Sequence, residues 1–454
     1  MTRRPLACIV LAAGKGTRMK SALPKVLHPI GGMPMLKHVL ATAEALNPER
    51  IVVVVGPGMD NVAQAAAPHA TVVQERQAGT GDAVAAARPL LEEFAGDVLV
   101  LYGDTPLIRA ETLGSMVEAR GTAADPAVVV MGMRPADPGA YGRLITGEGG
   151  LERIVEFLDA SPEERALGLC NAGFMAFDGA RMWGIIEGIG NANAKGEYYL
   201  TDAVEVARAK GWNCAAVEGP VEDALGVNSR AELAALEKIF QGRMRRAAME
   251  NGATLVDPDT VWFSPDTVIG RDVLVGPNVF FGPGVVVEDG AEIRAFCHFE
   301  GARIGAGAQI GPYARMRPGT VVGEGCHIGN FVELKNTVMA NGSKANHLSY
   351  LGDADIGSGT NIGAGTITCN YDGFLKHRTT IGDGVFVGTH STLVAPVTLE
   401  SGSYVAAATV ITRTVPADSL AVARARQENK EGWAPRFRAR KLAEKAAKAA
   451  AKKG

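Results

Sequence analysis

A glycine-rich turn with two cations nearby is the first feature of this sequence that could carry out chemistry. An apolar run at residues 7–11 leads into A-A-G-K-G-T-R-M at residues 12–19, and Pro24-Lys25 follows. Such a turn between a strand and a helix presents backbone N–H groups to a phosphate. It lacks the G-K-[ST] of a P-loop and the third glycine of a dinucleotide-binding fingerprint. Arg18 and Lys25 add positive charge, so the pattern predicts a phosphate-binding site of another kind.

The stretch from Leu11 to Lys25 resembles the signature of the sugar-1-phosphate nucleotidyltransferases, L-x-x-G-x-G-T-R-M followed by P-K. In that family a sugar 1-phosphate attacks the α-phosphorus of a nucleoside triphosphate and releases pyrophosphate. The resemblance implies Mg²⁺, because the clustered phosphates must be neutralised and the protein mainly positions them. It also implies that Arg18 and Lys25 are catalytic residues that stabilise the phosphates.

A carboxylate that binds the metal is then expected at a strand end near this turn. The buried run at residues 98–101 continues into Tyr102-Gly103-Asp104, and ligands of open α/β sheets gather at the carboxyl ends of strands. We therefore predict Asp104 as a metal ligand. Asn228, in G-V-N, is predicted as a second oxygen ligand, since Mg²⁺ takes few protein ligands and several phosphate or water oxygens.

The resemblance continues along the N-terminal half. Gln74 and Gly79-Thr80 resemble the segment that contacts the base, and three later segments resemble those that contact the sugar: Y-G-R at 141–143, I-V-E at 154–156 and N-A-G at 171–173. One departure is Asp82, which stands where the family pattern has His. We expect this position to be peripheral.

A second candidate site surrounds His347 in the C-terminal half. The runs at residues 317–319, 331–335, 343–350 and 370–373 gather cations and this one histidine. Acetyl transfer from a thioester to an amine needs a base for the ammonium proton and cations for a substrate phosphate. A histidine side chain titrates near neutral pH and suits that role, so we predict His347 as the general base.

Taken together, the whole chain resembles the bacterial bifunctional N-acetylglucosamine-1-phosphate uridyltransferases / glucosamine-1-phosphate acetyltransferases, whose catalytic histidine lies in S-K-A-x-H-L-x-Y. The resemblance implies that glucosamine 1-phosphate is acetylated by acetyl-coenzyme A. N-acetylglucosamine 1-phosphate then reacts with UTP and gives UDP-N-acetylglucosamine, a precursor of the cell wall. The family resemblance also implies a homotrimer with acetyl sites shared between subunits.

The resemblance assigns binding residues position by position. For UTP and UDP-N-acetylglucosamine they are Leu11, Ala12, Ala13, Gly14, Lys25, Gln74, Gly79, Thr80, Tyr102, Gly103, Asp104, Gly142, Glu156, Asn171 and Asn228. For glucosamine 1-phosphate they are Arg317, Lys335, Tyr350 and Asn361. For acetyl-coenzyme A they are Ala364, Asn370, Tyr371, Thr389, Ala407 and Arg424, with Thr389 replacing the usual Ser.

The N-terminal elements that must position the first site follow an α/β pattern. Short apolar runs predict buried parallel strands, and helical patterns lie between them. The predicted strands are residues 7–11, 51–55, 97–101 and 127–131, and the predicted helices include residues 35–46 and 80–93. We expect a Rossmann-like layered fold whose mixed sheet is largely parallel. Residues 229–250 form one further helical pattern, in which Ser229 and Glu232 make a capping box.

From about residue 251 an apolar residue recurs every six positions. The series begins at Ile269 and Val275, reaches Ile411, and contains single-residue slips. This is a hexapeptide repeat, in which three short strands make one triangular coil. The family resemblance supplies the left hand. Two gaps, at residues 336–355 and 368–380, are expected to be irregular insertions on the working face.

Composition limits the remaining possibilities. The last 19 residues carry eight Lys or Arg and one Glu, so the rest of the chain has a net charge of −10. An acidic body disfavours general nucleic-acid binding, and the basic tail is read as a solvated helix. Six scattered cysteines suit a reducing cytoplasm, and no apolar run is long enough to span a membrane. We expect three parts: a nucleotidyltransferase domain at 1–228, a linker helix at 229–250 and an acetyltransferase β-helix with tail at 251–454.

Two alternatives stay open at this point. One is a single-activity sugar-1-phosphate nucleotidyltransferase with a structural or regulatory β-helix, which predicts that His347→Ala leaves all activity intact. The other is a binding and assembly protein with a decayed nucleotide site. The intact glycine-rich turn, Lys25 and Asp104 disfavour the second alternative.

Overall fold

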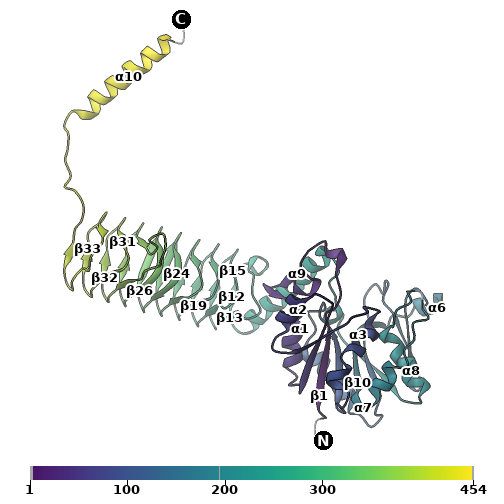
Figure 1. The fold of residues 1–454 in the computed structure, drawn as a ribbon. Helices are drawn as coiled ribbons and strands as arrows, with labels where there is room; N and C mark the ends of the chain where they lie inside the picture. Colours follow the sequence, from purple (N-terminus) through teal and green to yellow (C-terminus); the bar gives the residue numbers. More distant parts are fainter. Residues whose placement is uncertain (1–3, 194, 452–454) are drawn as a thin grey trace. The chain divides into compact units, whose positions relative to one another are not determined.

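The computed structural model describes residues 4–193 and 195–451, which form two compact units, Met1–Val286 and Val287–Gly454. The first unit contains a nine-stranded sheet with the order β5-β4-β1-β6-β10-β7-β11-β9-β8 (Figure 1). Its strands are β1 Leu6–Leu11, β4 Arg50–Val55, β5 Ala70–Val73, β6 Asp97–Tyr102, β7 Val128–Met133, β8 Arg143–Gly147, β9 Gly150–Val155, β10 Cys170–Asp178 and β11 Cys214–Glu218. A separate short hairpin pairs β2 (Pro29–Ile30) with β3 (Met33–Pro34).

The four strands predicted from the sequence are confirmed as β1, β4, β6 and β7. Strand β1 pairs in parallel with both β4 and β6. Sequence reading missed the other five strands of this sheet, β5, β8, β9, β10 and β11, of which β10 lies antiparallel between β6 and β7. The mixed sheet is therefore confirmed, and its carboxyl edge collects the ends of β1 and β6.

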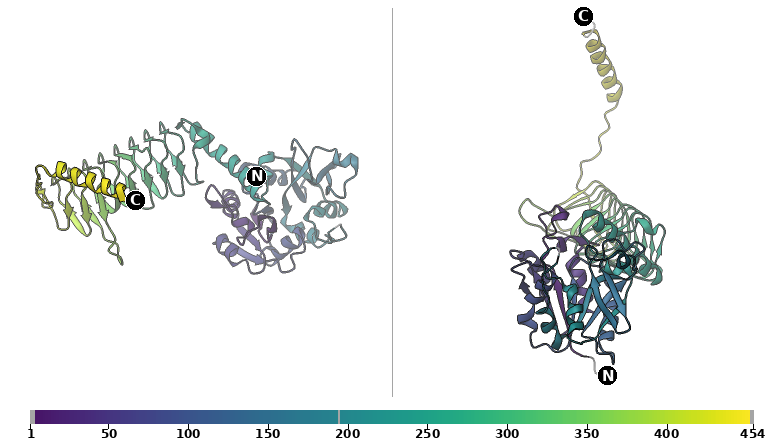
Figure 2. Two further views of the ribbon diagram at one scale, coloured as in Figure 1. Left: turned by 90° about the horizontal axis from the view of Figure 1, so that it is seen from above. Right: turned by 90° about the vertical axis from the view of Figure 1, so that its right-hand side faces the viewer.

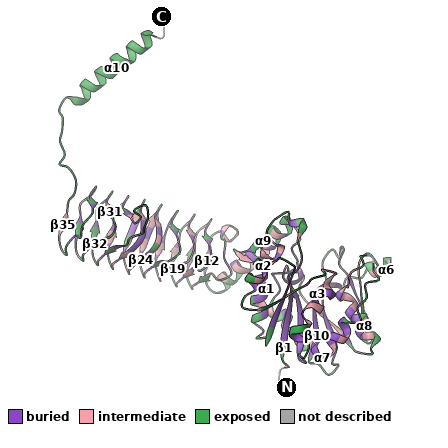
Figure 3. Cartoon of the chain, in the orientation of Figure 1, coloured by how far each residue is buried: buried purple, intermediate pink, exposed green. Residues whose placement is uncertain are grey.

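Side chains of the central strands alternate between two apolar layers, as expected when both faces of a sheet are covered. Ile9 and Val100 face one core cluster, whereas Cys8 and Leu99 face the other. Figure 3 shows the central strands coloured as buried. Helices α1 Met35–Glu44, α2 Asp60–Ala66, α3 Thr80–Ala86, α4 Arg88–Leu91, α5 Ala110–Arg120, α6 Pro162–Arg165, α7 Gly179–Ile186 and α8 Ala203–Ala209 belong to this unit.

The single helix predicted over residues 80–93 is wrong, because the structure divides it into α3 and α4. Pro89 is the reason: it occupies the first turn of α4, and a proline cannot donate the hydrogen bond that would continue α3. The predicted helix at 35–46 is confirmed in α1, which ends two residues earlier.

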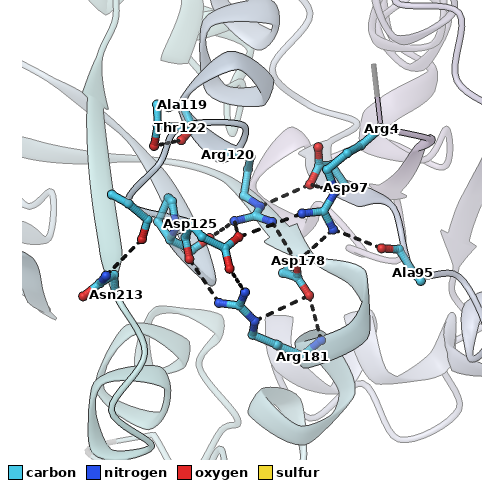
Figure 4. A network of polar contacts seen from close by, with 12 residues as sticks. Arg4, Ala95, Asp97, Ala119, Arg120, Thr122, Asp125, Asp178, Arg181 and Asn213 are labelled. Atoms are coloured by element: carbon cyan, nitrogen blue, oxygen red, sulfur yellow. Dashed lines mark hydrogen bonds and ion pairs between the residues drawn. The ribbon is translucent and has the colours of Figure 1, made fainter. Parts of the chain in front are cut away.

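A buried network of ion pairs lies at one edge of the sheet (Figure 4). This edge is opposite the strand ends that carry the predicted site. The Arg120 guanidinium is fully buried and donates to Asp97 Oδ1 at 3.2 Å and Asp178 Oδ2 at 2.8 Å. Arg4 donates to the same Asp178 oxygen at 2.9 Å. Burial raises the pKa of Asp97 despite Arg120 and Arg4. This network ties β6, β10 and α5 together, and its role is structural.

Helix α9 (Arg230–Glu250) confirms the helical pattern predicted at residues 229–250. Ser229 caps it, and the Ser229 and Glu232 side chains form the predicted capping box. Within the first unit, the Gln241 side chain donates to the Phe263 carbonyl and accepts from the Phe263 amide, both at 2.8 Å. These bonds connect α9 to the first strands of the repeat, β12 Thr254–Leu255, β13 Val268–Ile269, β14 Leu274–Val275 and β15 Phe280–Phe281.

The second unit continues as a left-handed parallel β-helix, and its coils lie side by side in Figure 2. One sheet contains β17 Glu292–Ile293, β20 Gln309–Ile310, β23 His327–Asn330, β25 Lys344–His347, β27 Asn361–Ile362, β30 Phe386–Val387, β33 Tyr404–Val405 and β35 Leu420–Ala421. The other strands of this unit are β18 His298–Phe299, β19 Ala302–Ile304, β21 Arg315–Met316, β22 Thr320–Val322, β24 Glu333–Met339, β26 Tyr350–Ile356, β28 Ile367–Cys369, β29 Thr379–Ile381, β31 Thr392–Val394, β32 Val397–Leu399 and β34 Val410–Ile411. Strand β16 (Val286–Val287) spans the boundary between the units.

The six-residue apolar register is confirmed, since its residues from Ile269 to Ile411 are buried. The insertion expected at residues 336–355 is wrong. Met339, Ala345 and Leu351 are fully buried at the same spacing, and β24 pairs with β26 through this stretch. The small Ala345 and the single-residue slips concealed the repeat in the sequence. The gap at 368–380 does contain an irregular loop, in which Tyr371 bridges to Lys376.

Helix α10 (Trp433–Ala451) holds the described part of the basic tail, and every described residue of it is exposed. Trp433 and Phe437 stack on each other with ring centroids 4.8 Å apart. Among the described residues, no helix is long and apolar enough to cross a membrane.

Candidate active sites

A cleft of about 820 Å³ opens at the carboxyl ends of β1 and β6 in the first unit. Twelve of the residues predicted for nucleotide binding line it: Leu11, Ala12, Ala13, Gly14, Lys25, Gln74, Gly79, Thr80, Tyr102, Asp104, Glu156 and Asn171. Gly103, Gly142, Asn228 and the catalytic candidate Arg18 do not belong to the lining. Gly103 and Gly142 instead bond through their backbone to Leu11 and Asn171, both lining residues.

Gly16 leaves room for Lys25 to lie against the glycine-rich turn. Gly16 has a φ of +61°, and a Cβ there would lie 2.5 Å from Lys25 Cβ. A Cβ at Gly14 would meet no heavy atom within 4 Å, so this backbone is open to a ligand. The turn is therefore shaped for close approach of a phosphate.

Four charged or polar side chains converge beside this turn. Lys25 forms an ion pair with Asp104 and donates to Asn228 Oδ1 at 3.3 Å. The Arg18 guanidinium donates to the same Asn228 oxygen at 2.8 Å. Asp104 and Asn228 thus point oxygen atoms at a single cation, the Lys25 ammonium. The two predicted catalytic residues and the two predicted metal ligands lie in one cluster.

This donor set fits Mg²⁺. Its oxygens are hard ligands, and both already face a positive charge. Within residues 4–193 and 195–451, no three His, Cys, Asp or Glu side chains form a metal-binding group. A metal at Asp104 and Asn228 would therefore complete its coordination with phosphate and water oxygens, as Mg²⁺ commonly does.

The predicted base-contacting segment is tied to the glycine-rich turn. The Gln77 side chain donates to the Ala13 carbonyl at 3.0 Å, and Gln74 donates to the Gly79 carbonyl at 2.9 Å. The expectation that Asp82 is peripheral is wrong, because its buried carboxylate accepts a hydrogen bond from Gln74 at 3.0 Å.

The lining of the cleft also includes residues that sequence reasoning missed, among them Lys195, Glu197, Tyr199 and Thr201. Thr201 donates to Glu156 Oε1 at 3.3 Å, which links this segment to a predicted sugar-contacting residue. Next to it, burial and the carboxylates of Glu205, Glu156 and Asp159 raise the pKa of Asp202 to about 6. No strand pattern marked residues 195–202 in the sequence, and Gly196 alone did not single the segment out.

In the second unit, His347 ends β25 and lies beside Asn330 of the preceding coil, with which it is paired in register. The His347 Nδ1 atom lies 2.9 Å from Asn330 Oδ1. The amide oxygen can only accept, so Nδ1 carries the proton and Nε2 carries the lone pair. His347 itself is exposed in the single chain, so Nε2 is accessible for proton transfer. Asn330 is a further residue that sequence reasoning missed.

A cluster of cations lies on neighbouring coils, around the predicted sugar-phosphate residues. Lys335 lies 3.7 Å from Asp353 Oδ2, and its strand position pairs with Gly352, against which Tyr350 packs. Lys376, which sequence reasoning missed, lies beside Lys335, and this neighbouring ammonium lowers the pKa of Lys376. Two adjacent ammonium groups are suited to a dianionic phosphate.

The other predicted residues of this half divide between two places. Arg317 donates to Glu333 at 3.1 Å, and Glu333 pairs in register with Tyr350. Asn361 lies in a different sheet, where it pairs with Lys344 of the strand that ends at His347. Asn361 therefore shares a sheet with the candidate base His347, whereas Lys335 and Tyr350 belong to another sheet of the repeat.

The predicted acetyl-coenzyme A residues also separate. Ala364, Thr389 and Ala407 follow successive strands of one sheet and form a column, joined by backbone bonds from His390 to Ala364 and from Ala408 to Thr389. Asn370 is buried, and its side chain donates to Asp353. Tyr371 is exposed in the irregular loop, and Arg424 lies exposed beyond β35.

Comparisons with known proteins agree with this division of the chain. Residues 8–159 match the MobA-like NTP transferase domain family. Residues 266–301 and 301–336 match the bacterial transferase hexapeptide family of six repeats, and residues 378–413 match the hexapeptide repeat of succinyl-transferase. The fold and its sites thus define a nucleotidyltransferase joined to a hexapeptide-repeat acyltransferase.

Full-length relatives narrow the class further. The bifunctional protein GlmU of Paramagnetospirillum magneticum is 57% identical over 448 residues, covering 99% of this chain and 100% of the relative. That of Rhodospirillum rubrum is 58% identical over 433 residues, covering 95% of this chain and 97% of the relative. The chain belongs to the bifunctional GlmU family, and it is a bifunctional enzyme with a uridyltransferase and an acetyltransferase half.

Proposed function

We propose that the C-terminal half acetylates glucosamine 1-phosphate with acetyl-coenzyme A, and that the N-terminal half then couples N-acetylglucosamine 1-phosphate to UTP. The products are UDP-N-acetylglucosamine and pyrophosphate. The observation that carries the proposal is the convergence of Arg18, Lys25, Asp104 and Asn228 beside the glycine-rich turn. Bifunctionality favours this function over both the single-activity and the assembly alternatives.

In the uridyltransferase half, the chain positions the reactants and neutralises charge. The open backbone around Gly14 would receive the triphosphate, and Arg18 and Lys25 would stabilise the charge on the leaving pyrophosphate. Asp104 and Asn228 would hold Mg²⁺, which supplies further charge neutralisation when bound. Glu156 and Asn171, at the sugar end of the cleft, would orient the attacking sugar 1-phosphate.

In the acetyltransferase half, His347 Nε2 would take a proton from the amine as its nitrogen attacks the thioester carbon. The carbon–sulfur bond then breaks, and the proton that His347 has taken would pass to the sulfur, so that coenzyme A leaves as a thiol and His347 is again neutral. Arg317, Lys335, Tyr350 and Asn361 would bind the sugar phosphate. The column of Ala364, Thr389 and Ala407, with Asn370, Tyr371 and Arg424, would bind acetyl-coenzyme A.

We further propose a homotrimer whose β-helices pack side by side. The rings of Phe296, Tyr313 and Phe331 stack with centroids 4.9 and 5.1 Å apart, and each is about half exposed in the single chain. An exposed apolar column of this kind favours burial against another copy. Light scattering measures the mass of the assembly in solution. A mixture of His347→Ala and Lys376→Ala subunits tests whether one acetyl site takes residues from two subunits, and restored acetyl transfer in the mixture would support shared sites.

The domain limits at 1–228, 229–250 and 251–454 remain part of this proposal, as does a cytoplasmic location, which the substrates UTP and acetyl-coenzyme A support.

A product assay tests the function. Purified protein is given glucosamine 1-phosphate, acetyl-coenzyme A, UTP and Mg²⁺, and one component is omitted at a time. UDP-N-acetylglucosamine should form only in the full mixture, and N-acetylglucosamine 1-phosphate should accumulate without UTP. If free thiol never appears, the roles assigned to His347 are wrong.

A further inference from the structure

The Asp82 carboxylate, in the first turn of α3, holds the segment that contacts the base. Its side chain is only 5% exposed. Oδ2 accepts hydrogen bonds from Gln74 Nε2 at 3.0 Å and from the Ala78 backbone at 3.1 Å. Oδ1 accepts one from the Arg76 guanidinium at 2.6 Å. A single side chain thus connects three residues of the loop between β5 and α3.

The bonds of Gln74 determine which end of its amide faces the cleft. Nε2 donates both to Asp82 and to the Gly79 carbonyl, which is 2.9 Å away, so both of its N–H groups are used. Oε1 accepts no hydrogen bond from any described residue. Four described side-chain atoms are buried without a hydrogen-bond partner, and Oε1 is not among them, so it is not sealed inside the protein. Gln74 lines the cleft, so this oxygen is accessible to a ligand.

Asp82 and the Gly79 carbonyl together impose the orientation of the amide, because an ionised carboxylate and a carbonyl can only accept hydrogen bonds. Burial alone would raise the pKa of Asp82, but the bonds from Gln74, Ala78 and Arg76 outweigh burial and lower it. Turning the Gln74 amide over would bring Oε1 against the Asp82 oxygen. The carboxylate therefore holds the carbonyl toward the cleft.

We propose that Asp82 is a positioning residue that sets base specificity, by keeping Gln74 Oε1 as an acceptor for the N3–H of uracil. Uracil carries a hydrogen on N3, whereas cytosine has a bare lone pair there. A fixed carbonyl attracts the first base and repels the second, and a site that leaves such a buried group unpaired discriminates strongly. This inference rests on the proposed uridyl transfer.

Removing the carboxylate leaves the Gly79 carbonyl as the one acceptor that still holds Gln74 Nε2. In an Asp82→Ala variant, Gln74 can therefore turn its NH₂ group to the N3 lone pair of cytosine by giving up that one bond. We expect the ratio of kcat/KM for UTP to that for CTP to fall by about tenfold or more. Asp82→Asn should largely restore the ratio, since its amide oxygen can still accept from Gln74 and Ala78 while its NH₂ group turns toward exposed Arg76.

The experiment measures pyrophosphate release from UTP and from CTP by the full chain and its variants. Arg76→Met is the matched control, because it removes the bond to Asp82 Oδ1 and a cation–π contact with the Tyr198 ring, from a side chain that is 68% exposed, and leaves the Asp82–Gln74 bond in place. It should keep the ratio of the unchanged enzyme. If Asp82→Ala does not fold, Asp82→Ser replaces it, since a hydroxyl is too short to reach Gln74.

The outcomes separate this inference from the proposed function. Failure of the unchanged enzyme to use UTP would overturn the uridyl transfer on which the inference rests. Efficient use of UTP together with an unaltered UTP-to-CTP ratio in the Asp82→Ala or Asp82→Ser variant would overturn the role of Asp82 alone. An equal loss with both nucleotides would likewise show a purely structural role.

Discussion

The Arg18 guanidinium donates a 2.8 Å hydrogen bond to Asn228 Oδ1, although 210 residues separate them in the chain. The same amide oxygen accepts from Lys25. Asn228 immediately precedes Ser229, the N-cap of α9, so this segment returns to the glycine-rich turn near the N-terminus. The predicted phosphate-binding cluster thus combines residues from distant parts of the chain.

Asn228→Ala should therefore lower kcat for uridyl transfer by about tenfold to a hundredfold, because one oxygen of the cation cluster is lost. Acetyl transfer should stay unchanged. Asn213→Ala is the control, since the Asn213 side chain donates to the Ala124 carbonyl and the residue does not line the cleft. Equal pyrophosphate release by the two variants would contradict the assignment.

Asp104→Asn keeps the shape of the side chain and removes its charge. We expect uridyl transfer to fall by about 10²- to 10³-fold and the Mg²⁺ concentration for half-maximal activity to rise, because a carboxylate ligand and the partner of Lys25 are lost together. A titration of pyrophosphate release with Mg²⁺ measures both effects. An unaltered Mg²⁺ requirement would place the metal elsewhere.

His347→Ala should lower acetyl transfer by about 10²- to 10⁴-fold, as expected for loss of a general base, and leave uridyl transfer from supplied N-acetylglucosamine 1-phosphate intact.

Asn330→Ala should lower kcat about tenfold with an unchanged KM for acetyl-coenzyme A, because it releases the His347 ring from its 2.9 Å bond. Asn330→Asp keeps an acceptor and should recover activity. Free thiol is the measured product, and full activity of Asn330→Ala would exclude a positioning role.

Stability should depend on pH through Asp202. Its pKa is raised to about 6 by burial and by Glu205, Glu156 and Asp159, so the folded state holds the proton more tightly than the unfolded chain does. The free energy of unfolding should therefore fall as pH rises from about 4 to about 6. Asp202→Asn should raise stability at pH 7.5 by about 1 kcal/mol, after allowance for solvent screening, and have little effect at pH 4. Thermal melting at the two pH values tests this, and a larger gain at pH 4 would reverse the sign.

The buried ion network of Arg120, Asp97 and Asp178 lies at the edge of the sheet opposite the nucleotide cleft. Substitutions in it test the stability of the first unit without changing either candidate active site. Arg120→Leu should destabilise the first unit by about 3 kcal/mol, since it leaves Asp97 and Asp178 with only part of their compensating charge. Arg134→Ala removes an exposed ion pair with Glu218 and should cost less than about 1 kcal/mol. Urea unfolding compares the two, and equal midpoints would show that the network contributes no net stability.

Local sequence was enough to predict the elements whose pattern repeats or whose residues are neighbours in the chain. The six-residue register from Ile269 to Ile411 identified the β-helix, because each coil buries the same position. The run from Leu11 to Lys25 predicted the phosphate turn, because the glycines and the cations that it needs all lie within 15 residues. The capping box at Ser229 likewise marked the start of α9.

Tertiary structure alone decided the features that depend on residues far apart in the chain. Strand β10 inserts antiparallel between β6 and β7, and the contacts of Lys376 with Lys335 and of Asn330 with His347 arise only when coils stack. Asp82 looked like a substitution of no consequence until folding buried it against Gln74. The physical reason is the same in each case. Periodicity and spacing indicate which face of a helix or strand a side chain occupies. The residue that it contacts there belongs to a segment far away in the chain, and only the packing of the two segments decides that contact.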